Sequence, residues 1–511
     1  MAFLFLSVCA SSADAQECDS AHAPTTVVYS EAGGTSQATV LSPASDGVVH
    51  AVDAGTGAPL WSFTAPELAA ASRHSGLITD IRVLRFDADN DGTIDVSRGD
   101  KVWLYFGLRK AGAFYYALDI TERARPRVLW KMGAAALDHL GDAWSTPTVA
   151  RVRVAGAAQN GEHFVLVFGG GHDNSDSVGN RIFMVDAATG QLLWFAGAND
   201  SARAPDLVLD DMSHSAPARV AVIDTDGDGF TDRMYAVDVS GVIWRFDIWN
   251  GQRRSSLVTG GVLADLSAEA SSEASTAGVA QFFNAPDVSL IQPRGRSPYY
   301  NVAVGSSDAF YAIRDNAPFA RRTQSEYRSA APIVVSQLVD IASASGASAG
   351  SGIPPDAPGW RLSLNAGESV VGESVTATGV VLFETAQLSS SGSGALGACT
   401  VVSAHVYAIR VDTATAGLDF NDDGDITAAD LSQALPQSVV PAELSIDVGS
   451  SGANHAGEGG SGTTGGGGVD GNSGSAASAS PTHCRVGSYE LPKCVSADVL
   501  LRTYWQRPSV K

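Results

Sequence analysis

The chain has 511 residues, enough for one large domain or about two to three smaller ones. Charged residues make up only 17%, and the 54 glycines and 21 prolines indicate many turns between short strands. The formal net charge of −22 argues against non-specific nucleic-acid binding, which needs positive charge, whereas an excess of carboxylates suits calcium. We therefore expect a strand-rich protein that does not bind nucleic acid.

Residues 1–15 have the pattern of an export signal. An apolar run over Ala2–Ala10 is followed by small residues that end at Ala15. The basic n-region is missing, which leaves a truncated start or a buried N-terminal strand as alternatives. No later apolar run reaches the roughly 18 residues that a membrane helix requires, so we expect an exported protein without a membrane span.

The cysteines fit an oxidising compartment. Cleavage after Ala15 would remove one and leave enough for two disulfides. Cys484 and Cys494 are close enough in sequence for a local bridge, but the pairing is open and free thiols are the alternative. The other cysteines are Cys9, Cys18 and Cys399.

A hairpin pattern recurs along the chain. An alternating apolar strand ends near Asp, and after a turn comes an apolar strand with Trp. Copies or partial copies begin at Ser45 (SDGVVHAVDAGTGAPLWSF), Phe114 (FYYALDITERARPRVLW), Gly179 (GNRIFMVDAATGQLLWF), Ser240 (SGVIWRFDIWNG), Asp308 (DAFYAIRD) and His405 (HVYAIRVDTATAG). About six such hairpins, each with an aromatic to pack between sheets, predict an all-β propeller with long loops. A large β-sandwich is the alternative.

We assign the propeller to residues 35–447 and a flexible Gly/Ser-rich insertion to 448–480. Residues 481–511 return to strand-like character in ADVLLRTYWQR. Because a propeller commonly closes by pairing a terminal strand with a blade from the other end of the chain, we expect a closing strand there.

Two acidic loops share the pattern D-x-D-x-D-G-x-x-D, at 87–95 and 224–232. Alternate residues of a tight loop direct their carboxylates at one centre, the glycine permits the turn, and the next residue offers its backbone carbonyl. Without a cation the carboxylates would repel one another. We expect Ca²⁺ in both loops, with an Asx-rich turn as the alternative. The expected ligands are Asp87, Asp89, Asp91, Thr93 and Asp95, and Asp224, Asp226, Asp228, Phe230 and Asp232.

A third loop, at 419–430, fits the full EF-hand scheme and forms a small calcium-loop insertion resembling that of dockerin modules. Ile426 and Leu431 are its expected apolar anchors. A dockerin has a pair of such loops, so we do not expect cohesin binding. The expected ligands are Asp419, Asn421, Asp423, Asp425, Thr427 and Asp430.

Other motifs carry less information. Arg98-Gly99-Asp100 spells a tripeptide that host-cell integrins recognise, which would require an exposed loop tip. No nucleophile, base and orienting group assemble into a catalytic triad, so we expect no enzyme activity.

In collinear order, several segments resemble the C-terminal β-propeller of the PilC/PilY type IV pilus proteins. They include DKVWLYFGLRKAGAFYYALDIT, FVLVFGGGHD, GNRIFMVDAATGQLLW and DTDGDGFTDRMYAVDVSGVIWRFDI, and together they cover roughly residues 40–440. The resemblance implies a modified propeller of about seven blades with quinoprotein-like hairpins. It also implies calcium at Asp224–Asp232 as a switch between pilus extension and retraction, with adhesion or twitching as the output. Minor pilins would be the partners, at the periplasm or outer-membrane surface and in the pilus (fimbrium).

Two alternatives come from proteins with similar hairpins. Quinoprotein dehydrogenases bind pyrroloquinoline quinone on a propeller, but they usually have adjacent cysteines, which this sequence lacks. A scaffold of outer-membrane assembly is the other alternative, and it would not require calcium loops.

Overall fold

The computed structural model describes residues 24–30, 35–44, 47–69, 78–109, 112–156, 161–200, 203–267, 281–341, 353–390, 399–436, 444–448, 482–486, 489–491 and 493–494. The expected export signal and almost all of the Gly/Ser-rich insertion lie outside these residues. The same holds for ADVLLRTYWQR (497–507), the strand-like part of the closing segment expected at 481–511. None of the helices in the described part is long and apolar enough to cross a membrane.

Strands dominate the described residues and form seven sheets, numbered here in chain order, beside one short helix, α1 (Gln324–Ser329). The first three sheets use neighbouring strands in sequence. Sheet 1 contains β1 (Thr25–Ser30), β2 (Ser36–Pro43), β3 (Val48–Asp53) and β4 (Pro59–Thr64). Sheet 2 contains β5 (Arg82–Phe86), β6 (Lys101–Gly107), β7 (Phe114–Asp119) and β8 (Arg127–Gly133). Sheet 3 contains β9 (Thr148–Arg153), β10 (Glu162–Gly169), β11 (Ile182–Asp186), β12 (Leu192–Gly197) and β13 (Leu207–Val208).

The later sheets follow the same plan, and sheets 4 and 5 have a short parallel strand, as sheet 3 has in β13. Sheet 4 contains β14 (Ala221–Ile223), β15 (Arg233–Val237), β16 (Val242–Ile248), β17 (Val258–Asp265) and β21 (Ile333–Val334). Sheet 5 contains β18 (Asp287–Ile291), β19 (Tyr299–Gly305), β20 (Ala309–Asp315), β22 (Val339–Asp340) and β23 (Gly359–Ser363). Sheet 6 contains β24 (Glu368–Val370), β25 (Val375–Ala377), β26 (Val380–Ser390), β27 (Cys399–Arg410) and β28 (Ser432–Ala434). Sheet 7 contains β29 (Leu444–Val448), β30 (Thr482–Val486) and β31 (Tyr489–Glu490).

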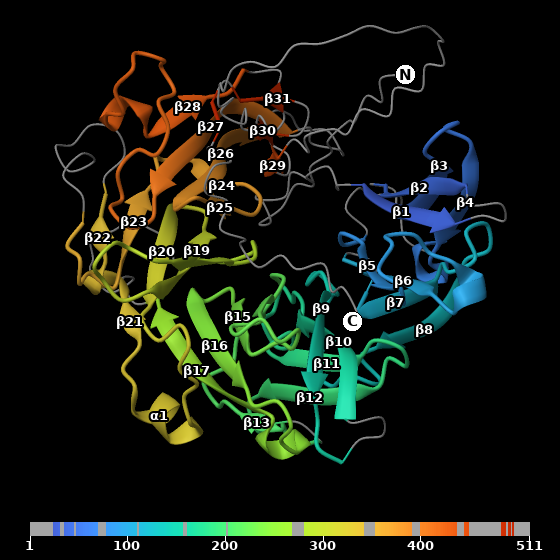
Figure 1. Cartoon of the computed structure of the whole chain (residues 1–511). Coiled ribbons are helices and arrows are strands. Elements are labelled where there is room, and N and C mark those ends of the chain that lie inside the picture. Colours follow the sequence, from blue (N-terminus) through green and yellow to red (C-terminus); the bar gives the residue numbers. More distant parts are fainter. Residues whose placement is uncertain are drawn as a thin grey trace, which may run out of the picture.

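The sheets lie side by side in chain order along an arc, from sheet 1 at one end to sheets 6 and 7 at the other (Figure 1). The apolar core is divided between them, because each large cluster joins consecutive sheets. Met184 of sheet 3 packs in one cluster with Phe246 of sheet 4, and Val237 of sheet 4 packs in another with Val304 of sheet 5. Alternate residues of each strand therefore face a neighbouring sheet, as in propeller proteins.

Two tryptophans of the repeat link consecutive sheets through their indole N–H groups. Trp61 of β4 donates its indole N–H to the carbonyl of Arg123, beyond β7, at 3.1 Å. Trp130 of β8 does the same to Ala187, beyond β11, at 2.9 Å. Each of these half-buried rings packs between two sheets while its N–H bonds to a carbonyl that follows a strand of the next sheet. The predicted packing of Trp between sheets is confirmed.

Each predicted hairpin copy contributes to a different sheet, from sheet 1 for the copy at Ser45 to sheet 6 for the copy at His405. The prediction of an all-β fold built from repeated hairpins is therefore confirmed. Sheet 1 begins at Thr25, before residue 35, where we placed the start of the propeller.

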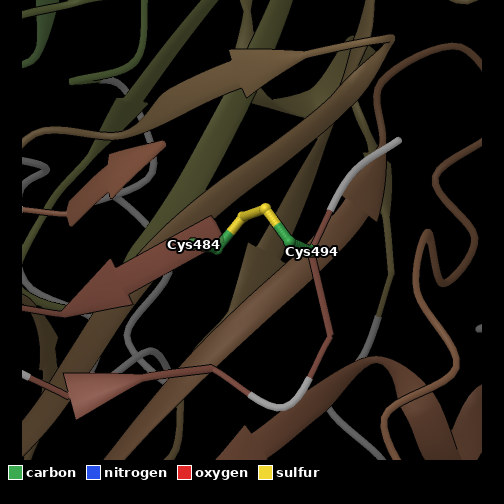
Figure 2. Close-up of a disulfide and its surroundings, with 2 residues drawn as sticks. All are labelled: Cys484 and Cys494. Atoms are coloured by element: carbon green, nitrogen blue, oxygen red, sulfur yellow. A yellow bond between two sulfur atoms is a disulfide. The ribbon is translucent and has the colours of Figure 1, made fainter. Parts of the chain in front are cut away.

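Of the pairings that the sequence left open, Cys484 and Cys494 form the local disulfide, which fastens β30 to the chain beyond β31 (Figure 2). Within the described residues, β30 pairs with β29 and β31. Cys484 of β30 and Leu491 after β31 pack with Leu418 and Phe420, in the connection between β27 and β28. Sheet 7 is thus docked on the segment that leads into the third acidic loop.

Candidate metal centres

The second acidic loop joins β14 to β15 and brings three carboxylates together. One oxygen of each of Asp224, Asp226 and Asp232 lies within 4.8 Å of the others. The backbone shapes this arrangement, because Asp224 accepts hydrogen bonds from the N–H groups of Gly227 at 2.7 Å and Gly229 at 2.8 Å. Three converging carboxylates in a tight loop are a donor set that suits a hard cation such as Ca²⁺.

Two other expected ligands of this loop, Asp228 and Phe230, make contacts outside the carboxylate trio. Asp228 accepts the N–H of Phe230 at 2.8 Å and is not part of the carboxylate trio. The Phe230 ring is buried beneath the guanidinium groups of Arg151 and Arg153, whose centres lie 4.4 and 3.7 Å from the ring centroid. This packing fixes the backbone of Phe230, whose carbonyl is the expected ligand.

The surroundings of Asp224 disfavour its ionised form. Burial raises the pKa of Asp224, and the charges of Asp232 and Asp228 add to this rise, while the hydrogen bonds from Gly229 and Gly227 oppose it. A group whose ionised form is disfavoured by burial and by neighbouring carboxylates gains from a bound cation. The donor set of the loop therefore fits a metal ion.

In the first loop, the carboxylates of Asp87, Asp89 and Asp91 converge within 4.8 Å. Asp91 also accepts the Thr93 N–H at 2.8 Å, and the Thr93 hydroxyl lowers the pKa of Asp91. Asp95 is directed elsewhere, since it accepts the N–H of Ser97 at 2.9 Å as the N-cap of a short 3₁₀ turn. The structure thus brings together three of the expected side-chain ligands.

In the third loop, one carboxylate organises the backbone. Asp430 is fully buried and accepts the N–H groups of Phe420 at 3.0 Å, Asn421 at 3.2 Å and Thr427 at 2.9 Å. The bond from Thr427 is the main cause of a lowered pKa of Asp430. Asp423 and Asn421 accept the N–H groups of Asp425 and Asp423 at 2.9 and 3.0 Å. No trio of converging carboxylates forms among residues 419–430, where one expected ligand is the amide Asn421.

The expected anchors of the third loop have different outcomes. Leu431 is buried, as predicted, with 2% of its surface exposed. Ile426 is 56% exposed, so its prediction as an apolar anchor is wrong. The EF-hand anchor packs against flanking helices, whereas this loop lies between strands β27 and β28 and offers Ile426 no apolar surface.

Two loops contain buried oxygen atoms without a hydrogen-bond partner. They are one carboxylate oxygen of Asp87 and one of Asp419, each at the first position of its loop. A buried carboxylate oxygen is normally satisfied by a donor or a cation. These atoms are consistent with a cation-binding role for the first position.

No family model matches the chain. Over 212 residues it is 28% identical to a type IV pilus biogenesis factor PilY1 homologue of Xylella fastidiosa, covering 40% of this chain and 14% of the relative. Over 145 residues it is 30% identical to the type IV pilus biogenesis factor PilY1 of Pseudomonas aeruginosa, covering 28% of this chain and 11% of the relative. This chain is a homologue of PilY1.

The crystal structure of the Pseudomonas aeruginosa PilY1 C-terminal domain matches with a TM-score of 0.58 at 16% sequence identity. The match covers 89% of this chain and 92% of that domain, so the two share their fold. The matched part spans only about a seventh or less of the PilY1 relatives named above.

The resemblance to PilC/PilY proteins is thereby confirmed.

The integrin tripeptide of the sequence, Arg98-Gly99-Asp100, is not available for recognition. Asp100 is buried and accepts the N–H groups of Ala88 at 3.1 Å and Asp95 at 2.9 Å. Its carboxylate holds the first acidic loop against β6. The interpretation of Arg98–Asp100 as a receptor-binding tip is wrong, because a buried and hydrogen-bonded carboxylate cannot reach a receptor.

Sequence reasoning missed one residue at the second loop of this PilY1 homologue. Arg321 forms an ion pair with Asp232, 89 residues earlier in the chain. No local pattern reveals such a pair, since only the packing of sheet 4 against the segment after β20 brings the two side chains together.

Proposed function

We propose that this chain is a calcium-binding propeller of a type IV pilus biogenesis protein that works outside the cytoplasm and is not an enzyme. The observation that carries the proposal is the carboxylate trio of Asp224, Asp226 and Asp232, in a chain homologous to PilY1. A cation that neutralises such a trio holds the loop, and the surface around it, in one conformation.

The propeller of this proposal has seven blades, one for each sheet of the described residues. Support comes from the order of the sheets along the arc in Figure 1 and from apolar clusters that join consecutive sheets. Sheet 7 is the smallest, with three strands.

Calcium would be held by three loops. In the first, Asp87, Asp89 and Asp91 would bind the ion, with Thr93 and Asp95 completing the expected set. In the second, the trio would act with Asp228 and the Phe230 carbonyl. In the third, Asp419, Asn421 and Asp423 would act with Asp425, Thr427 and Asp430. When bound, Ca²⁺ supplies positive charge at the centre of each loop, and the protein supplies the shape.

The first test is a calorimetric calcium titration of residues 16–511 beside the single variants Asp89→Ala, Asp226→Ala and Asn421→Ala. We expect each variant to lose one saturable site. The absence of binding at calcium concentrations around 1 mM, where weak extracellular modules bind, would reduce the loops to acidic turns.

For the pilus role, we propose that an ordered second loop is needed for docking to minor pilins, and so for pilus extension, adhesion or twitching. The double variant Asp226→Ala, Asp232→Ala should lose pilus display on cells. The double variant Asp210→Ala, Asp211→Ala is a matched control, because these exposed aspartates lie outside the loop. Unchanged pilus display in the first variant would contradict the role.

A further inference from the structure

The second acidic loop already has a cation of its own. The guanidinium of Arg321 pairs with one carboxylate oxygen of Asp232, while the other oxygen accepts the N–H and hydroxyl of Thr225 at 2.9 and 2.8 Å. The Asp232 side chain is 3% exposed and that of Arg321 is 32% exposed. Asp232 belongs to the carboxylate trio, so Arg321 places positive charge on the site where we propose calcium.

Arg321 is held in place by a buried charged network that begins next to the acidic loop. Arg233, the residue after Asp232, donates to the carbonyls of Ala317 at 3.0 Å, Pro318 at 2.8 Å and Ala320 at 2.8 Å. The segment before Arg321 is therefore fastened to β15 by its own backbone carbonyls.

The segment after Arg321 is fastened to the neighbouring strand. The N–H of Arg322 donates to Asp247 of β16 at 2.9 Å, and the hydroxyl of Tyr327 in α1 donates to the same carboxylate at 2.7 Å. Asp247 in turn pairs with Arg233 and Arg245, and all three side chains are at most 1% exposed. The helix α1 lies next to β17, where the Gln324 side chain bonds to the backbone of Gly260 (Figure 1). The backbone of Arg321 is thus anchored on both sides, and its side chain can leave the loop without unfolding the segment.

We propose that Arg321 is an intramolecular competitor of calcium at the second acidic loop and sets the calcium affinity of that loop. This inference rests on the proposed calcium function and deepens it. In the calcium-free loop the guanidinium neutralises Asp232. When the divalent ion binds, it takes over that carboxylate, and Arg321 turns toward solvent.

The direction of the effect follows from charge. A positive group near a cation site repels the incoming ion, and its contact with a ligand carboxylate must be weakened on binding. Removing Arg321 also leaves the calcium-free trio with more uncompensated repulsion. Both contributions favour tighter calcium binding in a variant without the guanidinium.

Calcium titrations should compare wild type with Arg321→Gln and Arg322→Gln. Every protein of this series, including the reference with Arg321 intact that serves as wild type, should also carry Asp89→Ala and Asn421→Ala, so that the second loop dominates binding. Arg322→Gln is a matched control because it removes the same charge one residue away, where the guanidinium lies over the Tyr327 ring at 5.8 Å. We expect Arg321→Gln to bind calcium about tenfold more tightly than Arg322→Gln, and Arg321→Lys, which keeps the charge, to stay close to wild type.

Equal affinity of the two glutamine variants, or weaker binding by Arg321→Gln, would overturn the inference and leave the calcium function intact. If neither wild type nor Arg321→Gln binds calcium, the inference and the calcium function both fail. Arginine-selective labelling read by mass spectrometry gives an independent result. Calcium should increase labelling of Arg321 but not of Arg322, and unchanged labelling of Arg321 in protein that binds calcium would contradict the competition.

Discussion

The backbone N–H of Gly229 donates a hydrogen bond of 2.8 Å to Oδ2 of Asp224 and closes the second acidic loop. The glycine at the sixth position bonds to the aspartate at the first position in all three loops. All three glycines have φ between 84° and 92°, in the left-handed region that side chains avoid. The equivalent pairs are Gly92 with Asp87 and Gly424 with Asp419, at 2.8 and 3.1 Å.

Replacing Gly229 by Ala should therefore impair the second loop. A Cβ at φ +85° meets only Nη1 of Arg151, at an ordinary contact distance of 3.8 Å, so the cost comes from the backbone, at about 1–2 kcal/mol of unfolding free energy. Because the loop shape positions the carboxylates, calcium binding should weaken as well, as a titration would measure. Gly57→Ala, at φ +72° in the β3–β4 turn, is the control and should lose stability without losing calcium. Equal calcium affinity in the two variants would contradict this prediction.

Removing Asp247 should destabilise the protein strongly. Asp247 is fully buried and pairs with Arg233 at 2.8 Å and Arg245 at 3.1 Å, so Asp247→Ala leaves two buried guanidinium groups without this partner. We expect a loss of about 3–5 kcal/mol in urea unfolding. Asp340→Ala is the control, since that carboxylate is 38% exposed beside Arg361 and should cost less than about 1 kcal/mol. Similar losses for the two variants would show that the buried network contributes little.

Stability should depend on the charge of Asp287. Burial, with help from the charge of Glu373, raises the pKa of Asp287 from 3.8 to about 7, although Thr376 and Arg219 act in the opposite direction. A carboxyl with a raised folded pKa contributes stability that is fully present below about pH 4 and is lost as the pH rises toward 7.

Asp287→Asn should remove this loss, because the amide oxygen can still accept the hydroxyl hydrogen bond of Thr376 without carrying charge. Relative to wild type, the variant should gain on the order of a few kcal/mol between about pH 4 and pH 8. Urea unfolding in the presence of a chelator measures the difference, and exposed Asp210→Asn should show none. A constant difference between variant and wild type across this pH range would disprove the raised pKa.

The disulfide should stabilise sheet 7 and its contact with the third acidic loop. Lys493, next to Cys494, pairs with Asp422 of that loop at 2.6 Å. The double variant Cys484→Ser, Cys494→Ser should lose about 2–3 kcal/mol of local stability, seen as faster hydrogen exchange in residues 444–448 and 419–430. Reductant should reproduce this change in wild type and have no effect on the variant. Unchanged exchange in both regions would contradict the prediction.

The sequence alone determined the features whose partners are neighbours in the chain. The hairpins around Ser45 and Gly179 follow from alternation and turn residues, and the bond between Asp224 and Gly229 spans only five residues. Such features form wherever the segment lies, because local backbone geometry and side-chain chemistry specify them.

Only the tertiary structure decided which groups from distant segments meet. It buried Asp100 and so removed the integrin interpretation, and it left Ile426 exposed beside strands where an EF-hand would have helices. It also brought Arg321 into an ion pair with Asp232 and grouped Arg233, Arg245 and Asp247 in one buried network of ion pairs. A charged side chain can be buried only where other residues provide opposite charges or hydrogen bonds. When those residues are distant in sequence, the packing of whole sheets against one another determines whether they come close enough.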